Sequence, residues 1–208
     1  QQALPLKFAL EAGYVANHAL GVLINRNINA GMVPGAGAAG QPLNQKFGRK
    51  ENTNVWTPFG STYQSLQVKL DRRFSEGLVM TTAYTFGKAI NVSDDNGGLN
   101  IHIYPEMNRG RSGHDRTHIV VSGFVYELPF GEGKRWLQSG AARWLVGDWQ
   151  VSGGFVSQTG TPLGISYSAA TLNAPGNGNR PNLNGKPEIY GAVGRGVKWY
   201  DVTKFSAP

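Results

Sequence analysis

The stretch Ser61-Thr-Tyr-Gln-Ser-Leu-Gln-Val-Lys-Leu-Asp-Arg-Arg73 decides the fold class, because its polarity alternates from one residue to the next. Leu66, Val68 and Leu70 share one face of an extended chain. The opposite face carries the polar and charged side chains, which are Ser65, Gln67, Lys69, Asp71 and Arg73. A period of two over this length predicts a β-strand with one apolar face.

The residues that follow predict a β-hairpin. Phe74-Ser-Glu-Gly77 has the composition of a short turn, and a second alternating run comes directly after it. In that run Leu78, Met80, Thr82, Tyr84 and Phe86 alternate with Val79, Thr81, Ala83, Thr85 and Gly87. Two alternating runs joined by a few residues that include Gly are typical of antiparallel neighbours.

Three other segments are predicted strands. In segment 5–17, one face carries Leu6, Phe8, Leu10, Ala12, Tyr14 and Ala16, and the other carries Lys7, Ala9, Glu11, Gly13 and Asn17. In segment 148–159, Trp149, Val151 and Phe155 oppose Gln150, Ser152 and Gln158. Segment 116–128 is ambiguous in register, because Ile119-Val-Val121 puts apolar residues on both faces. For its outer face we favour Val120, Phe124, Tyr126 and Leu128.

The connections between these strands differ in length. Residues 18–60, 88–115 and the tail from 169 are rich in Gly, Asn and Pro and are predicted to be loops, with a linker at 129–147. Leu163 to Ser168 either extends the last strand or forms a short strand of its own. No helix-length periodic segment separates the strands. The sequence therefore predicts an all-β fold of about five to six long antiparallel strands.

Composition narrows the function classes. The chain has 29 Gly in 208 residues, roughly double the usual share of about 7%. It has no Cys, which excludes disulfide scaffolds, thiolate zinc sites and cysteine nucleophiles. The net charge of +7 is dispersed, without the basic run typical of nucleic-acid binding. No apolar run approaches the ~18 residues of a membrane helix.

Strand length favours a transmembrane β-barrel over a soluble sheet. The predicted strands run about 10–14 residues, whereas soluble strands usually have about 5–6 and membrane strands need ~9–11. Tyr14, Tyr84, Phe86 and Tyr126 lie near strand ends, as interfacial aromatics do in barrels. A soluble sheet with one solvated face would also alternate, so alternation alone leaves that alternative open.

In a transmembrane β-barrel, one face of each strand meets lipid and the other face meets the lumen. The lumen-facing set is predicted to be Lys7, Glu11, Gln67, Lys69, Asp71, Arg73, Gln150, Ser152 and Gln158. The lipid-facing set is predicted to be Leu6, Phe8, Leu10, Leu66, Val68, Leu70, Leu78, Met80, Tyr84, Phe86, Trp149, Val151 and Phe155. Because barrels have short periplasmic turns and long extracellular loops, the turn at 74–77 is expected to be periplasmic.

A series of motifs follows in order along the chain: the stretch 61–78, Ala83-Tyr-Thr-Phe-Gly-Lys-Ala-Ile90, Asp115-Arg116, Ser122-Gly123, Tyr126-Glu-Leu-Pro-Phe-Gly131, Gly147-Asp-Trp-Gln-Val-Ser-Gly153, Gln158-Thr-Gly-Thr-Pro162, Asn179-Arg-Pro-Asn182 and the ending from Trp199. In their order and spacing, these motifs resemble the Oar-like TonB-dependent receptors of the bacterial outer membrane. The resemblance covers residues 52–208 well and is weaker before them.

The resemblance implies a parent barrel of roughly 22 strands with an internal plug. It also implies a carboxypeptidase-regulatory-like domain and a TonB-interacting segment near the N-terminus of the parent, so we expect this chain to be an excerpt of the barrel. The implied partners are outer-membrane lipid and lipopolysaccharide, the TonB complex reached through that N-terminal part, and an unidentified bulky solute. No nucleic-acid partner is expected.

No motif predicts catalysis, a metal or a cofactor. His114 and His118 are four residues apart, a spacing that aligns ligands on a helix and not on a loop entering a strand. Asp94-Asp-Asn-Gly-Gly98 lacks the spacing of a calcium loop and is typical of a turn. The function that the resemblance implies is solute uptake across the outer membrane, and we expect the protein not to be an enzyme. The alternatives are a surface or secreted β-rich binding domain, and a barrel with an adhesive or signalling role.

Overall fold

A computed structural model describes residues 2–94, 97–167, 171–191 and 194–208. The strands are β1 (Gln2–Ala3), β2 (Phe8–Asn27), β3 (Asn54–Ser75), β4 (Leu78–Asn91), β5 (Gly110–Arg111), β6 (His118–Glu127), β7 (Gln150–Gln158), β8 (Asn182–Leu183) and β9 (Phe205–Ser206). The helices are η1 (Pro5–Lys7), η2 (Gly37–Gly40), α1 (Pro42–Phe47), η3 (Pro105–Asn108), α2 (Ala141–Val146) and η4 (Val202–Lys204). In the described part of the chain, no helix has the length and apolarity needed to cross a membrane.

The described residues form two compact units. The first contains the chain up to Ala19, Ser61–Ile90 and Gly113–Pro162, and we call it the sheet unit. The second contains Leu20–Gly60, Asn91–Ser112 and Leu163–Pro208, and we call it the loop unit. The predicted long loops thus contribute to a unit of their own.

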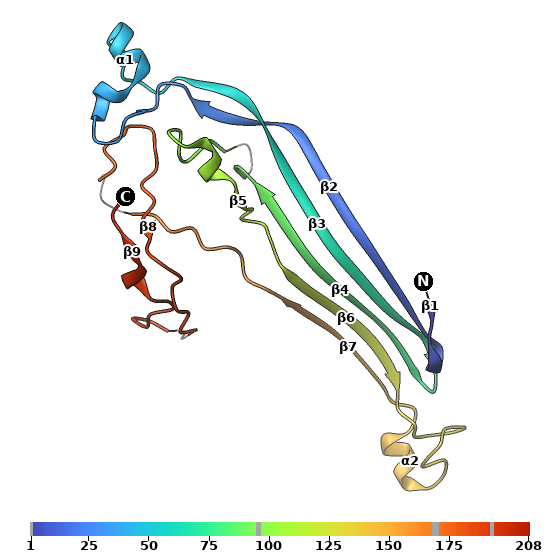
Figure 1. Ribbon diagram of the computed structural model, residues 1–208. Coiled ribbons are helices and arrows are strands. Elements are labelled where there is room, and N and C mark those ends of the chain that lie inside the picture. Colours follow the sequence, from blue (N-terminus) through green and yellow to red (C-terminus); the bar gives the residue numbers. More distant parts are fainter. Residues whose placement is uncertain (1, 95–96, 168–170, 192–193) are drawn as a thin grey trace. The chain divides into compact units, whose positions relative to one another are not determined.

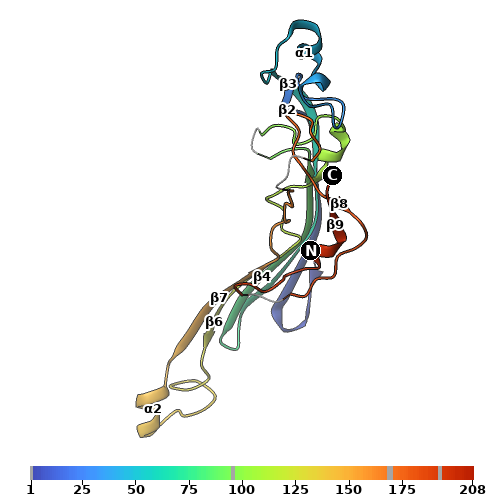
Figure 2. The same ribbon diagram turned by 90° about the vertical axis from the view of Figure 1, so that its left-hand side faces the viewer.

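Long antiparallel strands in the order β1-β2-β3-β4-β6-β7 make up the sheet, which confirms the predicted all-β class. Figure 1 shows them side by side, and Figure 2 shows the same strands as one layer. Each long strand pairs with the next one along the chain, so the topology is a meander with β1 and β7 at its edges. The sheet as described is open and not a closed cylinder.

The β3–β4 hairpin follows the sequence prediction closely. Its ladder pairs Leu66 with Phe86 and Leu70 with Thr82, and the turn consists of Glu76 and Gly77. Both turn residues have positive φ, 49° and 81°, as a type I′ hairpin requires. A Cβ on Gly77 would lie 2.6 Å from the carbonyl oxygen of Glu127, so only glycine fits there without a shift.

The beginning of segment 5–17 differs from the prediction. Leu6 and Lys7 do not lie on the two faces of a strand, because they belong to η1 and have φ of 58° and 60°. This turn reverses the chain so that β1 pairs with the start of β2, Ala3 opposite Ala9. Their alternation is real but falls in a tight turn, where the left-handed backbone ends strand geometry.

Several other strand boundaries also differ. β2 continues to Asn27 and β3 begins at Asn54, so the first long loop spans 28–53 and not 18–60. β4 extends to Asn91, and β6 is shorter than predicted, beginning at His118 and ending at Glu127. No strand occurs in the described residues 163–167, and Ser168 lies outside the described residues.

The buried apolar residues are distributed unevenly between the units. The fully buried hydrophobic residues are Ile24, Ala30, Leu99, Ile101 and Ala174, and all of them belong to the loop unit. Among its described residues, the sheet unit therefore has no buried hydrophobic core of its own. A single layer with apolar side chains on one face needs an apolar environment outside the layer.

Candidate functional site

The ladders place the predicted apolar residues together on one face of the sheet unit. Directly opposite residues share a face, and the pairs include Leu66 with Phe86, Val68 with Tyr84, Met80 with Phe124, Tyr84 with Val120, Leu78 with Tyr126, and Tyr126 with Val151. We call this set, with Leu70 and Phe155, the apolar face. The favoured register of the ambiguous strand thus agrees with the pairing for Val120, Phe124 and Tyr126, and Leu128 lies just beyond the end of β6.

The apolar face is exposed in the described residues. Phe86 is 48% exposed, Phe124 40% and Phe155 58%. The polar groups on this face form hydrogen bonds with one another. The hydroxyl oxygens of Thr82 and Ser122 lie 2.7 Å apart, and the Tyr84 hydroxyl lies 2.8 Å from His118 Nδ1. Soluble surfaces rarely present such a continuous apolar area, which a lipid environment would cover.

The opposite side of the sheet, which we call the polar face, brings together Gln67, Lys69 and Asp71 of β3 with Thr81 of β4. Lys69 Nζ lies 2.8 Å from Asp71 Oδ2, and the Thr81 hydroxyl donates to Asp71 Oδ1 at 2.8 Å. Glu11 of β2 interacts electrostatically with Lys69, so it lies toward the same cluster. Lys69 and Asp71 thus form a partly exposed ion pair on this face.

Three more predicted lumen residues extend the polar face on β7. Gln150 pairs with Glu127, Ser152 with Val125, and Gln158 with Ile119. Lys7 is not part of this face because it lies in η1. Arg73 lies at a β-bulge, where the register shifts between Arg72 and Ser75 and two residues oppose Val79. Trp149 immediately precedes β7, and its carbonyl accepts a hydrogen bond from the Leu128 amide at 2.8 Å.

The polar face has a hollow near Lys69 and Asp71, where its residues are small. Thr81, Gly123 and Gly154 share it, and together with their neighbours they line a shallow, open hollow of about 590 Å³. A Cβ on Gly123 would meet nothing within 4 Å. Around the hollow, the aliphatic side chains of Val79, Val121 and Val156 are 37%, 45% and 66% exposed. The face therefore offers a shallow, partly apolar hollow beside the charged side chains of Lys69 and Asp71.

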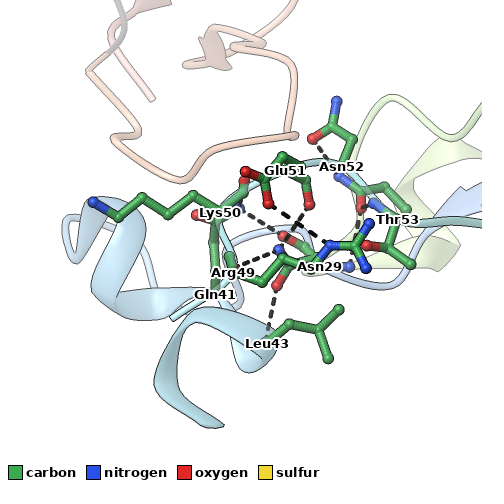
Figure 3. A network of polar contacts seen from close by, with 9 residues as sticks. Asn29, Gln41, Leu43, Arg49, Lys50, Glu51, Asn52 and Thr53 are labelled. Carbon is green, nitrogen blue, oxygen red and sulfur yellow. Dashed lines mark hydrogen bonds and ion pairs between the residues drawn. The ribbon is translucent and has the colours of Figure 1, made fainter. Parts of the chain in front are cut away.

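In the loop unit, amide side chains hold the loop 28–53 in place (Figure 3). Asn29 and Gln41 are almost completely buried. Asn29 Nδ2 donates to the carbonyls of Arg49 and Glu51 at 3.0 and 2.9 Å, and its Oδ1 accepts from the Leu43 amide at 2.9 Å. Gln41 Nε2 donates to the carbonyls of Asn29 and Lys50. These side chains thereby form hydrogen bonds with backbone groups that have no partner in a β-sheet.

A second amide, Asn177, joins segments that are distant in the sequence. Its Oδ1 accepts from the amide of His102 at 2.6 Å, and its Nδ2 donates to the carbonyl of Gly31 at 2.9 Å. Asn108 folds the 99–108 segment in a similar way, accepting from the amides of Asn100 and Ile101 at 2.8 and 2.9 Å. The loops that emerge between the long strands are thus an ordered unit.

His102 is buried in this unit. Among the described residues, its ring nitrogen Nδ1 has no hydrogen-bond partner. Burial, and secondarily the charge of Arg26, lower the pKa of the His102 imidazole. The described residues contain no group of three His, Asp or Glu side chains placed to hold a metal.

Asp94 acts as a turn residue in the structure. Its carboxylate accepts from Asn91 Nδ2 at 2.6 Å and from the Ser112 hydroxyl at 2.7 Å, while Asp95 and Asn96 lie outside the described residues. The buried amides Asn29, Gln41, Asn108 and Asn177 were not predicted as important. The sequence signals them only as members of Asn-rich loops, since their partners are backbone groups.

Comparison with known proteins supports this reading of the sheet. The family model of the outer membrane beta barrel domain matches residues 1–208. Neither the curated proteins nor the solved structures provide a match. The antiparallel meander, the exposed apolar face and the family match agree in placing the protein in the outer membrane. The chain belongs to the outer membrane beta barrel domain family.

Proposed function

We propose that this chain is a segment of a TonB-dependent outer-membrane transporter that takes up a bulky solute. In this proposal the apolar face meets lipid, the polar face lines the lumen, and the loop unit faces the outside of the cell. The segment supplies structure and binding surface and is not an enzyme. Its partners are outer-membrane lipid and lipopolysaccharide, the solute, and the TonB complex through the N-terminal part of the parent protein.

The observation that carries the proposal is the small size of the side chains on the polar face of β4, β6 and β7. Small barrels fill their interior with their own bulky side chains, whereas large barrels leave room for water or for a plug. Here the face carries Ala83, Gly123, Ser152 and Gly154 around the open hollow. Such a face suits a wide lumen that its own side chains do not fill.

The exposed valines beside the hollow favour a plug over a simple water-filled pore. Val79, Val121 and Val156 present aliphatic surface on the same side as Lys69 and Asp71. Aliphatic side chains gain free energy when they leave water, about 25 cal/mol per Å² of buried area. A plug packed on this surface would supply that burial, and the charged cluster would remain in the hydrated part of the lumen.

The proposal is tested by solute depletion. A strain lacking the protein and the parental strain are grown in the same rich medium, and the spent media are compared by mass spectrometry. We expect one or more solutes to remain in the medium of the deletion strain, and a protonophore to produce the same result in the parental strain. Identical depletion by the two strains would overturn the transport proposal.

A matched pair of variants tests whether the solute passes along the polar face. Gly123→Trp fills the hollow on the polar face, whereas Phe155→Trp changes a residue of the apolar face that does not line the hollow. We expect Gly123→Trp to lower uptake while the amount of folded protein in the membrane is unchanged, and Phe155→Trp to leave uptake at the parental rate. If the deletion strain instead loses attachment to surfaces and depletes every solute normally, the adhesive alternative is the better account.

A further inference from the structure

A hollow of about 580 Å³ lies where the turn of the β3–β4 hairpin meets the segment that follows β6. Three cationic side chains line it, Arg72, Lys134 and Arg135, together with the aromatic rings of Tyr126 and Trp136 and the aliphatic Leu78. All of these residues belong to the sheet unit. Cations beside aromatic and aliphatic groups suit a ligand with an anionic head and an apolar tail.

The charges that line this hollow do not balance. Arg72 Nη2 lies 3.7 Å from Glu76 Oε2, and Lys134 forms an ion pair with Glu127. Arg135 has no carboxylate partner among the described residues, and its guanidinium carbon lies 5.3 Å from the centroid of the Trp136 ring. Three cations against two carboxylates leave the hollow with an excess of positive charge.

Arg72 occupies an unusual place for an arginine. It pairs with Met80, so it belongs to the same side as Leu78 and Tyr126 of the apolar face. Its side chain is only 12% exposed, and its buried Nε has no hydrogen-bond acceptor among the described residues. A charged group on a lipid-facing surface is costly, and the cost falls toward the membrane interface, where a headgroup can pair with it.

We propose that this hollow binds the phosphate of an anionic phospholipid from the periplasmic leaflet. The inference rests on the apolar face meeting lipid and on the short hairpin turn being periplasmic, and it does not depend on what the barrel transports. The planar guanidinium groups suit phosphate oxygens, and Lys134 adds a point charge. Trp136 and Tyr126 suit the headgroup level, and Leu78 suits the first methylene groups of the acyl chains.

The proposal is tested on the purified full-length protein in detergent by native mass spectrometry. Phosphatidylglycerol, phosphatidylcholine and inorganic phosphate are added separately. We expect phosphatidylglycerol to be retained by the wild type, and Arg135→Gln to weaken its retention by about tenfold, the factor that corresponds to one charge-assisted hydrogen bond. Arg135 lies outside the strands, so this variant is expected to fold even where Arg72→Gln does not.

Two further variants separate a built site from general surface charge. Arg143→Gln removes a cation of α2 that does not line the hollow, and we expect it to leave retention unchanged. Glu127→Gln removes a carboxylate from the lining, and we expect it to tighten retention. Equal retention of both phospholipids, or no effect of Arg135→Gln, overturns the proposal. Binding of inorganic phosphate without retention of phosphatidylglycerol overturns the assignment to a lipid.

Discussion

Asn177 accepts a hydrogen bond from the backbone amide of His102, 75 positions away in the sequence, at a distance of 2.6 Å. The same side chain accepts from the amide of Ile103 at 3.2 Å and donates to the carbonyl of Gly31 at 2.9 Å. One amide therefore satisfies the backbone of two other loops. The order of the loop unit depends on such contacts as well as on its small apolar core.

Removing this side chain tests that dependence. Asn177→Ala leaves the His102 amide and the Gly31 carbonyl without partners, at a cost of about 1–3 kcal/mol for each buried group. We expect faster hydrogen exchange in residues 31–37 and 101–103, with exchange in β3 and β4 unchanged. Asn184→Ala is the matched control, because Asn184 is exposed and, among the described residues, its side chain bonds only to the Ser206 hydroxyl. Unchanged exchange in Asn177→Ala would contradict the role of this amide.

Acid is expected to loosen the loop unit through His102. Because burial lowers the pKa of this imidazole in the folded unit, the unfolded chain binds the proton more readily. The contribution of neutral His102 to stability is thus fully present above the ordinary pKa of about 6.5 and is lost as pH falls below it. Hydrogen exchange of residues 99–108, corrected for intrinsic rates, should rise between pH 7.5 and pH 5. This rise in exchange should disappear in His102→Gln. If the rise persists in that variant, another titrating group causes it.

The hairpin turn is expected to tolerate no side chain at Gly77. Its φ of 81° is left-handed, and a Cβ would come within 2.6 Å of the Glu127 carbonyl oxygen. The left-handed backbone alone costs about 1–2 kcal/mol for a non-glycine residue, and the close contact adds to it. Gly77→Ala should therefore reduce the fraction of folded protein, measured by heat-modifiable gel migration. Gly13→Ala is the control, since a Cβ at Gly13 meets nothing within 4 Å. Equal folded fractions would show that the turn can rearrange.

The assignment of the two faces can be tested directly, because the chain contains no Cys. Spin labels at single cysteines introduced for Gln67, Val68, Lys69 and Leu70 should alternate in accessibility in reconstituted membranes. Labels at positions 68 and 70 should collide with oxygen, which partitions into lipid, and labels at 67 and 69 with a water-soluble nickel complex. The same accessibility at all four positions would be incompatible with a barrel wall.

The sequence predicted the pairing of β3 and β4 well because alternation and a two-residue turn are local signals. It predicted the end of the first strand poorly. Beyond Asn17 the segment Ala19–Ile24 is apolar on both faces, so period two is lost although the strand continues to Asn27. The left-handed turn at Leu6 and Lys7 was missed for the opposite reason, since its residues happen to alternate.

The buried amides of the loop unit could not be predicted from local pattern at all. Asn29 bonds to carbonyl groups 20 and 22 positions away, and Asn177 to one 146 positions away. Backbone carbonyls occur at every residue, so no residue type marks the partner. The predicted lumen-facing residues of β3 and β7 share one face of the sheet, except Arg73 at the bulge, because the alternation there coincides with the ladder; that this face lines a lumen stays a prediction.

The meander described for the sheet has a consequence for the order of folding. Each long strand can pair with the preceding long strand, so the sheet can grow one strand at a time. The β3–β4 turn is short, and the long connections 28–53 and 92–117 add little to the entropy of closure, because that cost rises only with the logarithm of loop length. The contact between Asn177 and Gly31 joins the chain ahead of β3 to the chain beyond β7. It can form only after the intervening strands have been synthesised, so this loop contact would report that the strands between residues 31 and 177 are present.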